Sequence, residues 1–165
     1  VYKRQRVGRF SFGRGGIRIE SSALRGMLKS RPPLLGTHTA TAVLAHAPQY
    51  GLVMRKYRKN EAALAKLRAH TGARVEVLFG SWCPRCQQTI GNALRVEREI
   101  AGSAVAFQYH GLPNPPAAWK DARFVATHAK ALPTAIVWVG NREVGRIAPK
   151  DFGRFDRVLA GILSR

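Results

Sequence analysis

Beyond residue 60 the apolar positions of this chain repeat at two spacings, which alternate along the sequence. Apolar residues three or four apart predict helices, whereas apolar residues at alternate positions or in short runs predict strands. Segments of the two kinds follow in the order helix, strand, helix, strand, helix, strand, strand and helix, at about 61–70, 75–79, 84–102, 105–109, 118–130, 134–139, 143–147 and beyond 151. This order predicts an α/β fold with a central mixed sheet, parallel in its early strands and covered by helices on both faces.

Residues with strong local preferences mark the ends of these elements. Asn60 can cap the first helix, and Pro84 suits the first turn of the second. A turn at Gly140 predicts that the segment 143–147 returns as an antiparallel strand. Asp151 is predicted to cap the last helix.

Residues 1–47 show no such periodicity, and residues 48–165 are therefore predicted to be the folded domain. Two interpretations remain for the first segment: a disordered leader and a weak signal-peptide-like extension. The second would begin at Met27, with basic residues after it, a diluted apolar stretch over 34–44 and cleavage after Ala45. On either interpretation, removing the first segment is expected to leave a chain that folds.

The chain of 165 residues is strongly basic, because 28 Lys and Arg stand against 9 Asp and Glu, a formal net charge of +19. Such a surface attracts nucleic acid, anionic lipid or acidic proteins. The basic residues are spread along the whole sequence, however, and no dense basic run alternates with aromatic residues. No specific nucleic-acid partner is therefore expected, and no apolar run approaches the length of a membrane span.

Only two cysteines occur, three positions apart, as Cys83 and Cys86. A structural disulfide framework needs more pairs at wider spacing. The pair lies where a predicted strand ends and a helix begins, so that Cys83 meets the unpaired N–H groups and the positive end of the helix dipole, which favour a thiolate. With the positive charge of Arg85 nearby, Cys83 is predicted to be the nucleophile and Cys86 the resolving thiol.

A bare pair of this spacing is also half of a zinc site. Zinc would need two further ligands, and the sequence offers neither a second pair of cysteines nor histidines at ligand spacing. Folding would have to bring His110 or His128 to the pair to complete such a site. No metal is therefore expected, and a metal-binding thiol protein or a non-catalytic binding module remains the alternative to a redox enzyme.

Three motifs, in the right order, resemble those of the thioredoxin superfamily. The segment VLFGSWCPRC, which ends at Cys86, is similar to the active-site strand and helix start of that family. The segment LPT, centred on Pro133, resembles the cis-proline loop, and GNREVGR, which starts at Gly140, resembles the hairpin that follows it. The resemblance covers about residues 57–165 and implies a thioredoxin-like fold.

The resemblance also implies a thiol–disulfide oxidoreductase that acts on protein thiols and disulfides and needs no cofactor beyond its own Cys83–Cys86 disulfide. By the same resemblance Pro133 would be cis and would pack against the disulfide, while the backbone of Leu132 would pair with an extended substrate. The other site residues that it implies flank the cysteines and the proline: Trp82, Pro84 and Arg85 as active-site support, and Thr134 in substrate binding.

The family resemblance and the cysteine count also indicate the setting in which the protein would work. A bacterial protein of this kind would be a monomer that contributes to cell redox homeostasis and would depend on an unidentified redox partner. The residues leave open whether it oxidises, reduces or isomerises its substrates. The lack of any cysteine outside the pair slightly favours a periplasmic or secreted location over the cytoplasm, since mispairing is avoided in an oxidising space.

One position departs from the family pattern. Thioredoxins usually carry a buried acid six residues before the first cysteine, and this chain has Val77 there. The neighbouring Glu76 is expected to point to the other face of the sheet, because side chains alternate along a strand. Either water or Glu76 would then take the proton of Cys86, or exchange would be slow.

Overall fold

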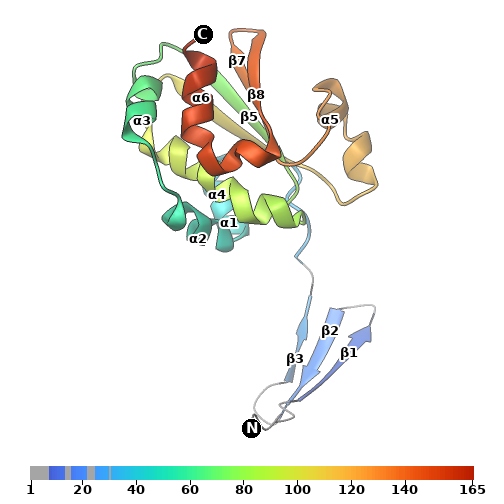
Figure 1. Cartoon of the computed structure of the whole chain (residues 1–165). Helices are drawn as coiled ribbons and strands as arrows, with labels where there is room; N and C mark the ends of the chain where they lie inside the picture. The colour runs from blue at the N-terminus through green and yellow to red at the C-terminus, as the bar shows by residue number, and fades with distance from the viewer. Residues whose placement is uncertain (1–7, 14–15, 22–24, 30) are drawn as a thin grey trace. The chain divides into compact units, whose positions relative to one another are not determined.

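The computed structural model describes residues 8–13, 16–21, 25–29 and 31–165, and the chain divides into two compact units after Pro32. The first unit holds a three-stranded antiparallel sheet that the sequence pattern did not predict (Figure 1). Its strands are β1 (Arg9–Gly13), β2 (Gly16–Glu20) and β3 (Arg25–Leu28). The segment predicted as a leader thus contains regular structure, and its residues 1–7, 14–15, 22–24 and 30 lie outside the described ones.

The second unit, from Pro33 to Arg165, is built on a five-stranded mixed sheet in the order β4-β6-β5-β7-β8. Its strands are β4 (Gly36–His38), β5 (Ala73–Phe79), β6 (Val105–Gly111), β7 (Thr134–Val139) and β8 (Arg142–Ile147). Strands β5 and β6 are parallel, whereas the pairs β4–β6, β5–β7 and β7–β8 are antiparallel. The predicted α/β fold with a central mixed sheet is confirmed, including the antiparallel return after Gly140.

Helices gather mainly on one face of this sheet (Figure 1). They are α1 (Ala40–His46), α2 (Gln49–Lys56), α3 (Glu61–Arg68), α4 (Pro84–Glu99), α5 (Ala122–Ala126) and α6 (Phe155–Leu163), with the 3-10 helices η1 (Ala117–Lys120) and η2 (Pro149–Arg154). Helix α5 reaches the opposite face, where its Arg123 pairs with Glu76 of β5. No helix in the described part of the chain has the length and apolar character needed to cross a membrane.

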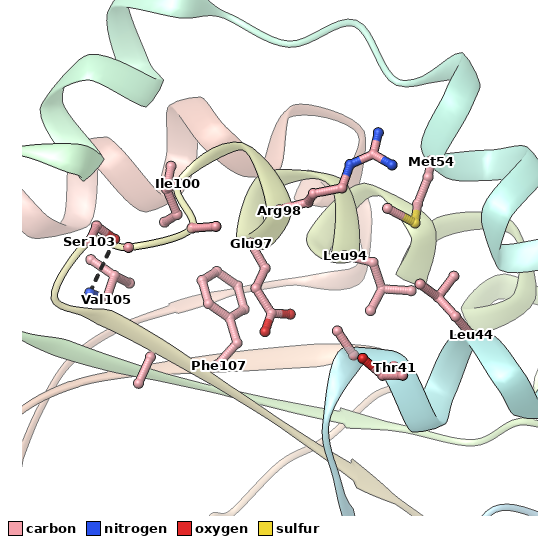
Figure 2. Close-up of a pocket in the computed structure, with 14 residues that line it drawn as sticks. Thr41, Leu44, Met54, Leu94, Glu97, Arg98, Ile100, Ser103, Val105 and Phe107 are labelled. Atoms are coloured by element: carbon pink, nitrogen blue, oxygen red, sulfur yellow. Dashed lines mark hydrogen bonds between the residues drawn. The ribbon is translucent and has the colours of Figure 1, made fainter.

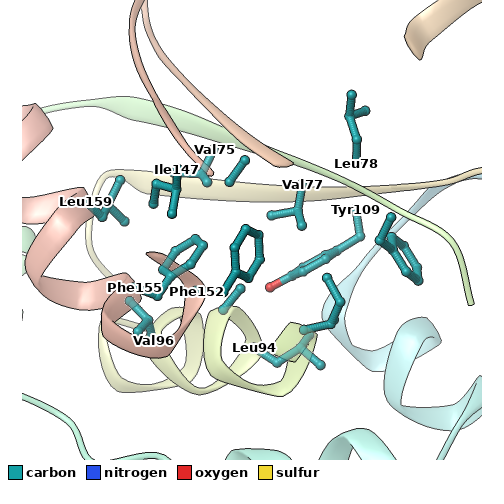
Figure 3. Packing of buried hydrophobic residues seen from close by; sticks show 14 of the residues in the cluster. Val75, Val77, Leu78, Leu94, Val96, Tyr109, Ile147, Phe152, Phe155 and Leu159 are labelled. Atoms are coloured by element: carbon teal, nitrogen blue, oxygen red, sulfur yellow. The ribbon is translucent and has the colours of Figure 1, made fainter. Parts of the chain in front are cut away.

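The core lies between the sheet and helices α4 and α6 (Figure 3). Val77 and Tyr109 are neighbours in register on β5 and β6, and both are completely buried. The ring of Phe155, on α6, lies 6.2 Å from that of Phe107 and 5.2 Å from that of Phe152. Because burying each such side chain contributes about 1.5–3 kcal/mol, this cluster fixes α4, and with it the helix start that carries the cysteines, on the sheet.

The helix predicted over 118–130 is instead η1 followed by the short α5. The carboxylate of Asp121 accepts hydrogen bonds from the backbone N–H groups of Arg123 and Phe124. These bonds cap the start of α5 and separate it from η1. A left-handed backbone at His128, with a φ of 51°, then stops the helix from continuing.

The last helix begins later than the sequence predicted. Asp151 lies inside η2, where its carboxylate accepts a hydrogen bond from the Arg154 side chain at 2.7 Å, and it does not cap a helix. Helix α6 begins after that turn and carries Asp156 in its first turn, where a negative charge is favoured by the helix dipole. The same carboxylate accepts a hydrogen bond from the Tyr57 hydroxyl at 2.7 Å, which links α6 to the end of α2.

Residues 33–47, which the sequence reading placed before the domain, belong to the second unit. Strand β4 pairs with β6 at the edge of the sheet. Thr39 then caps α1 through its side chain, and Val43 of that helix is completely buried. The unit therefore begins at Pro33 and not at residue 48, as the sequence predicted. The elements before residue 48 are too short to show a period, since β4 has three residues and α1 has seven.

Candidate active site

The two cysteines lie where β5 gives way to α4. A tight turn follows the strand, in which the Cys83 N–H donates to the Gly80 carbonyl at 3.0 Å. Cys83 then takes the N-cap position of α4 with an extended backbone, and Pro84 occupies the first helical turn. The Sγ atom of Cys83 accepts a hydrogen bond from the Cys86 N–H at 3.4 Å. This sulfur thus caps the helix at the point where the dipole favours negative charge.

The surroundings of the two thiols separate their acidities. A hydrogen bond from the Cys86 thiol, helped by the backbone N–H groups of Cys86 and Arg85 and by the Arg85 charge, lowers the pKa of Cys83 to about 6. Burial, and the hydrogen bond given to Cys83, raise the pKa of Cys86 far above its usual range. Cys83 keeps 9% of its surface exposed and Cys86 none. At neutral pH the site therefore holds a partly accessible thiolate beside a buried neutral thiol.

Alkylation of the reduced chain should modify Cys83 first, at a rate that rises through a midpoint near pH 6. At pH 7 about nine-tenths of such a thiol is ionised, against a few per cent of an unperturbed one. Iodoacetamide rates followed by mass spectrometry measure this. Because the folded pKa lies below the unfolded value of about 8.5, the thiolate also stabilises the reduced fold above that pH, and this contribution is lost as the pH falls through about 6.

Two variants at the second cysteine separate the causes of that acidity. Cys86→Ala removes the thiol donor, which is the largest cause, and should move the midpoint upward by more than Arg85→Ala does. Cys86→Ser keeps a hydroxyl donor and should preserve most of the shift. Equal modification rates of the two cysteines, or a midpoint near 8.5 in the unaltered chain, would contradict the assignment of Cys83 as the acidic thiol.

Trp82 is held rigidly beside the nucleophile. Its indole N–H donates to the Leu112 carbonyl at 3.1 Å, and the Leu112 N–H donates to the Phe79 carbonyl at 2.8 Å. Its ring lies against Gly80, where a Cβ atom would come within 2.5 Å of the indole. A side chain at residue 80 would collide with the indole, so this position of the ring requires glycine, and the hydrogen bond to Leu112 ties the active-site turn to the loop after β6.

A serine that the sequence reading did not single out ties the active-site turn to distant parts of the chain. Ser81 accepts a hydrogen bond on its Oγ from the Leu34 N–H at 3.0 Å, across 47 positions of sequence. Its backbone carbonyl accepts one from the Gln87 side chain at 2.8 Å. A serine before a Trp-Cys pair carries no local signal for these contacts, because both partners are supplied by the fold.

The segment around Pro133 reaches the same end of the sheet. Thr134 pairs in register with Leu78, one residue before the end of β5, so that Pro133 lies next to the end from which the cysteines follow. The Leu132–Pro133 peptide bond is cis, and Leu132 is buried. The Thr134 hydroxyl donates to the Ala131 carbonyl at 2.7 Å. A second cis bond, between Pro115 and Pro116, lies in the loop after β6 and was not predicted.

Val77, which stands where the family carries a buried acid, and Glu76, the candidate proton acceptor for Cys86, lie on opposite faces of β5. Val77 is completely buried on the face covered by α4. Glu76 is buried on the other face, where Arg123 binds its carboxylate through two N–H groups and Arg74 approaches at 3.4 Å. The Glu76 carboxylate is thus paired with arginines on the face of β5 opposite Val77, and it is not placed to take the proton of Cys86.

No group of three or more His, Cys, Asp or Glu residues that could hold a metal ion occurs among the described residues. Of the two histidines considered for a zinc site, His110 is engaged elsewhere. Its Nε2 atom lies 3.4 Å from the Asp121 carboxylate, and its Nδ1 atom lies 3.3 Å from the Thr37 hydroxyl. His128 is exposed on the loop that follows α5.

A pocket of about 390 Å³ lies away from the thiols, between α1, α4 and β6 (Figure 2). Its acidic group is Glu97, whose carboxylate accepts a hydrogen bond from the Tyr109 hydroxyl at 2.8 Å. Burial raises the pKa of Glu97. Since Glu97 lies eleven positions after Cys86 on the same helix, or about 16 Å along the axis, this pocket does not belong to the cysteine site.

No protein-family model matches the chain, and no curated protein matches it. Among solved structures it is similar to a Pseudomonas aeruginosa protein of unknown function, with a TM-score of 0.58 and 14% identity over 75% of this chain and 90% of that one. Thioredoxin O2 from Arabidopsis thaliana gives a TM-score of 0.44 and 19% identity over 62% of this chain and 85% of its own. A protein called Trxlp from Edwardsiella tarda gives 0.44 and 16% over 66% and 98%.

These identities bear on the fold alone. The molecule itself supplies the further features: a mixed sheet with parallel central strands, two cysteines at the start of the helix after β5, and an antiparallel hairpin entered through Pro133. The chain has a thioredoxin-like fold, as the sequence motifs predicted.

Proposed function

We propose that this chain is a thiol–disulfide oxidoreductase that exchanges disulfides with protein substrates through Cys83 and Cys86. The observation that carries the proposal is the difference in acidity and exposure between the two thiols. One is an acidic, partly exposed sulfur at a helix N-terminus, and the other is a buried thiol one helical turn away that hydrogen bonds to it. Two structural thiols in a core would both have raised pKa values.

The reaction with a disulfide substrate proceeds in two exchanges. The Cys83 thiolate attacks one sulfur of the substrate disulfide, so that a Cys83–substrate disulfide forms and the other substrate sulfur leaves as a thiolate, which takes up a proton. Cys86 then loses its proton and attacks the Sγ atom of Cys83, which forms the Cys83–Cys86 disulfide and releases the second substrate thiol. The substrate disulfide gains two electrons and the cysteine pair loses two, and the reverse sequence oxidises a dithiol substrate.

The neighbouring residues support this chemistry in distinct ways. Pro84 starts the helix, Arg85 adds positive charge beside the thiolate, and Trp82 covers the turn. The substrate chain would lie along the segment around Pro133, with Leu132 and Thr134 offering backbone groups at the end of the sheet where Cys83 is found. No cofactor beyond the cysteine pair is needed, and a separate redox partner restores the pair after each cycle.

Reduction of insulin by dithiothreitol tests the proposal. The chain at micromolar concentration should start insulin precipitation several times sooner than dithiothreitol alone, because the Cys83 thiolate attacks faster at neutral pH than a thiol of ordinary pKa. The matched control is the same protein carboxymethylated at Cys83. A binding module that turns nothing over would give the curve of dithiothreitol alone, and that result would overturn the proposal.

A further inference from the structure

An exposed aromatic side chain lies one ring away from the turn that carries the nucleophile. Trp119, on η1, keeps 46% of its surface exposed. Its ring packs edge-on against that of Trp82, with centroids 6.3 Å apart and an angle of 85° between the planes. Since Trp82 directly precedes Cys83, this exposed ring lies one aromatic contact away from the residue next to the nucleophile.

Neighbouring residues of η1 and α5 hold Trp119 in its position. Phe124 packs behind it with a centroid distance of 5.3 Å, and the neighbouring Ala118 is completely buried. Asp121 ends η1 and starts α5 through the backbone N–H groups that it binds. A large aromatic group held in this way offers contact area without first having to be ordered, which lowers the entropy cost of binding.

The exposed charged residues within three positions of Trp82 or Trp119 in the sequence are both basic. Lys120 follows Trp119 and is exposed, and Arg85 is exposed in the first turn of α4. Neither side chain forms an ion pair with a carboxylate in the described part of the chain. Glu76, on the strand before the cysteines, is engaged by Arg123, and Asp121, which follows Lys120, is engaged by backbone N–H groups and His110.

We propose that Trp82, Trp119, Lys120 and Arg85, hereafter the Trp119 surface, bind the substrate beside its reacting disulfide and select segments that carry an aromatic or aliphatic side chain flanked by acidic residues. The aromatic pair supplies the apolar contact, and the two cations supply charge complementarity, which raises the rate of encounter. This inference rests on the proposed function and names the substrate class of the same site.

Three synthetic peptides of equal length test the inference on the full reduced chain. Each carries one cysteine as a mixed disulfide with 2-mercaptoethanol; the first has Trp beside the cysteine and Glu flanks, the second Trp and Lys flanks, the third Ser and Glu flanks. The second-order rate of thiol release is measured at low and high salt. The first peptide should react about tenfold faster than the second at low salt, and salt should remove most of that difference because the charges are exposed.

Variants locate the preference on the molecule. Trp119→Ala should slow the Trp peptide with Glu flanks by about two- to tenfold, the range expected for an aromatic pair, and should affect the Ser peptide less, while Trp119→Phe should restore most of the rate. Lys120→Glu should slow the peptides with Glu flanks and speed the one with Lys flanks. Val139→Ala and Arg142→Glu are the matched controls, because Val139 ends β7 and Arg142 begins β8, at the end of this hairpin away from Pro133.

Exchange with the neutral 2-hydroxyethyl disulfide tests the proposed function separately from the substrate preference of the Trp119 surface. If the unaltered chain exchanges with this small disulfide but reacts equally with all three peptides, the Trp119 surface does not select substrates and the inference is overturned while the proposed function stands. If the chain exchanges with none of them, the proposed function fails and the inference with it. Equal effects of Trp119→Ala and Val139→Ala on the first peptide would also overturn the inference.

Discussion

A chain lacking residues 1–32 is expected to unfold at nearly the same temperature as the full chain, whereas a chain lacking residues 1–47 should lose roughly 3 kcal/mol or more of its free energy of unfolding. The first cut falls at the boundary between the two units. The second removes β4 and α1, which belong to the unit that carries the cysteines. The two truncations differ by only fifteen residues, so each serves as the control of the other.

The size of the second effect follows from what the segment buries. Val43 and Ala47 are almost completely excluded from solvent, and full burial of a valine side chain contributes about 1.5–3 kcal/mol. Loss of β4 also leaves the edge of β6 without the partner with which it pairs from Gly36 to His38. The hydrogen bond from the Leu34 N–H to Ser81, beside the cysteines, is lost as well. For a domain of this size, 3 kcal/mol corresponds to a fall in Tm of roughly 10 °C.

A single substitution tests the same contact in the full chain. A Cβ atom at Gly111 would lie 2.0 Å from the Leu34 carbonyl oxygen, so Gly111→Ala should displace the segment that precedes β4. The substitution should destabilise the full chain strongly but change the chain lacking residues 1–47 little, because the group with which it collides is absent there. Thermal unfolding followed by circular dichroism measures both. Equal Tm values for the two truncated chains would contradict this account of residues 33–47.

The parts of the site that the sequence predicts are those that depend on neighbours in the chain. The N-cap role of Cys83 and the helix start at Pro84 follow from residues within one turn of each other. The alternation of Val75, Val77 and Phe79 likewise predicts the strand that contains them. In the structure each of these side chains is completely buried. Such local and periodic signals survive without knowledge of the fold.

The parts that the sequence does not predict depend on contacts made across the chain. Strand β4 has three residues, too few to show a period, and its place beside β6 is set by pairing over more than 70 positions. The contact between Trp82 and Trp119 is of the same kind. Asp151 was predicted to cap a helix and instead binds a side chain within η2, whereas Asp121, inside the helix predicted over 118–130, binds the N–H groups that follow it. Local preference does not decide between those two outcomes.

Replacing each cysteine by serine should give opposite results with a protein disulfide. Cys83→Ser removes the only acidic thiol, and a serine hydroxyl is not ionised near neutral pH, so no exchange above background is expected. Cys86→Ser keeps the Cys83 thiolate and a hydroxyl donor beside it, so the first attack should continue at a comparable rate. The second exchange cannot follow, and the variant should stop after one event as a covalent adduct.

The most direct test of the proposed chemistry is therefore mass spectrometry of both variants after incubation with insulin under non-reducing conditions. We predict that Cys86→Ser accumulates one insulin molecule per protein molecule, with its two chains still joined by the remaining interchain disulfide, attached through Cys83 and released by dithiothreitol, and that Cys83→Ser accumulates none. An adduct on Cys86 in the Cys83→Ser variant at the same rate, or no adduct in either variant, would contradict the assignment of Cys83 as nucleophile and Cys86 as resolving thiol.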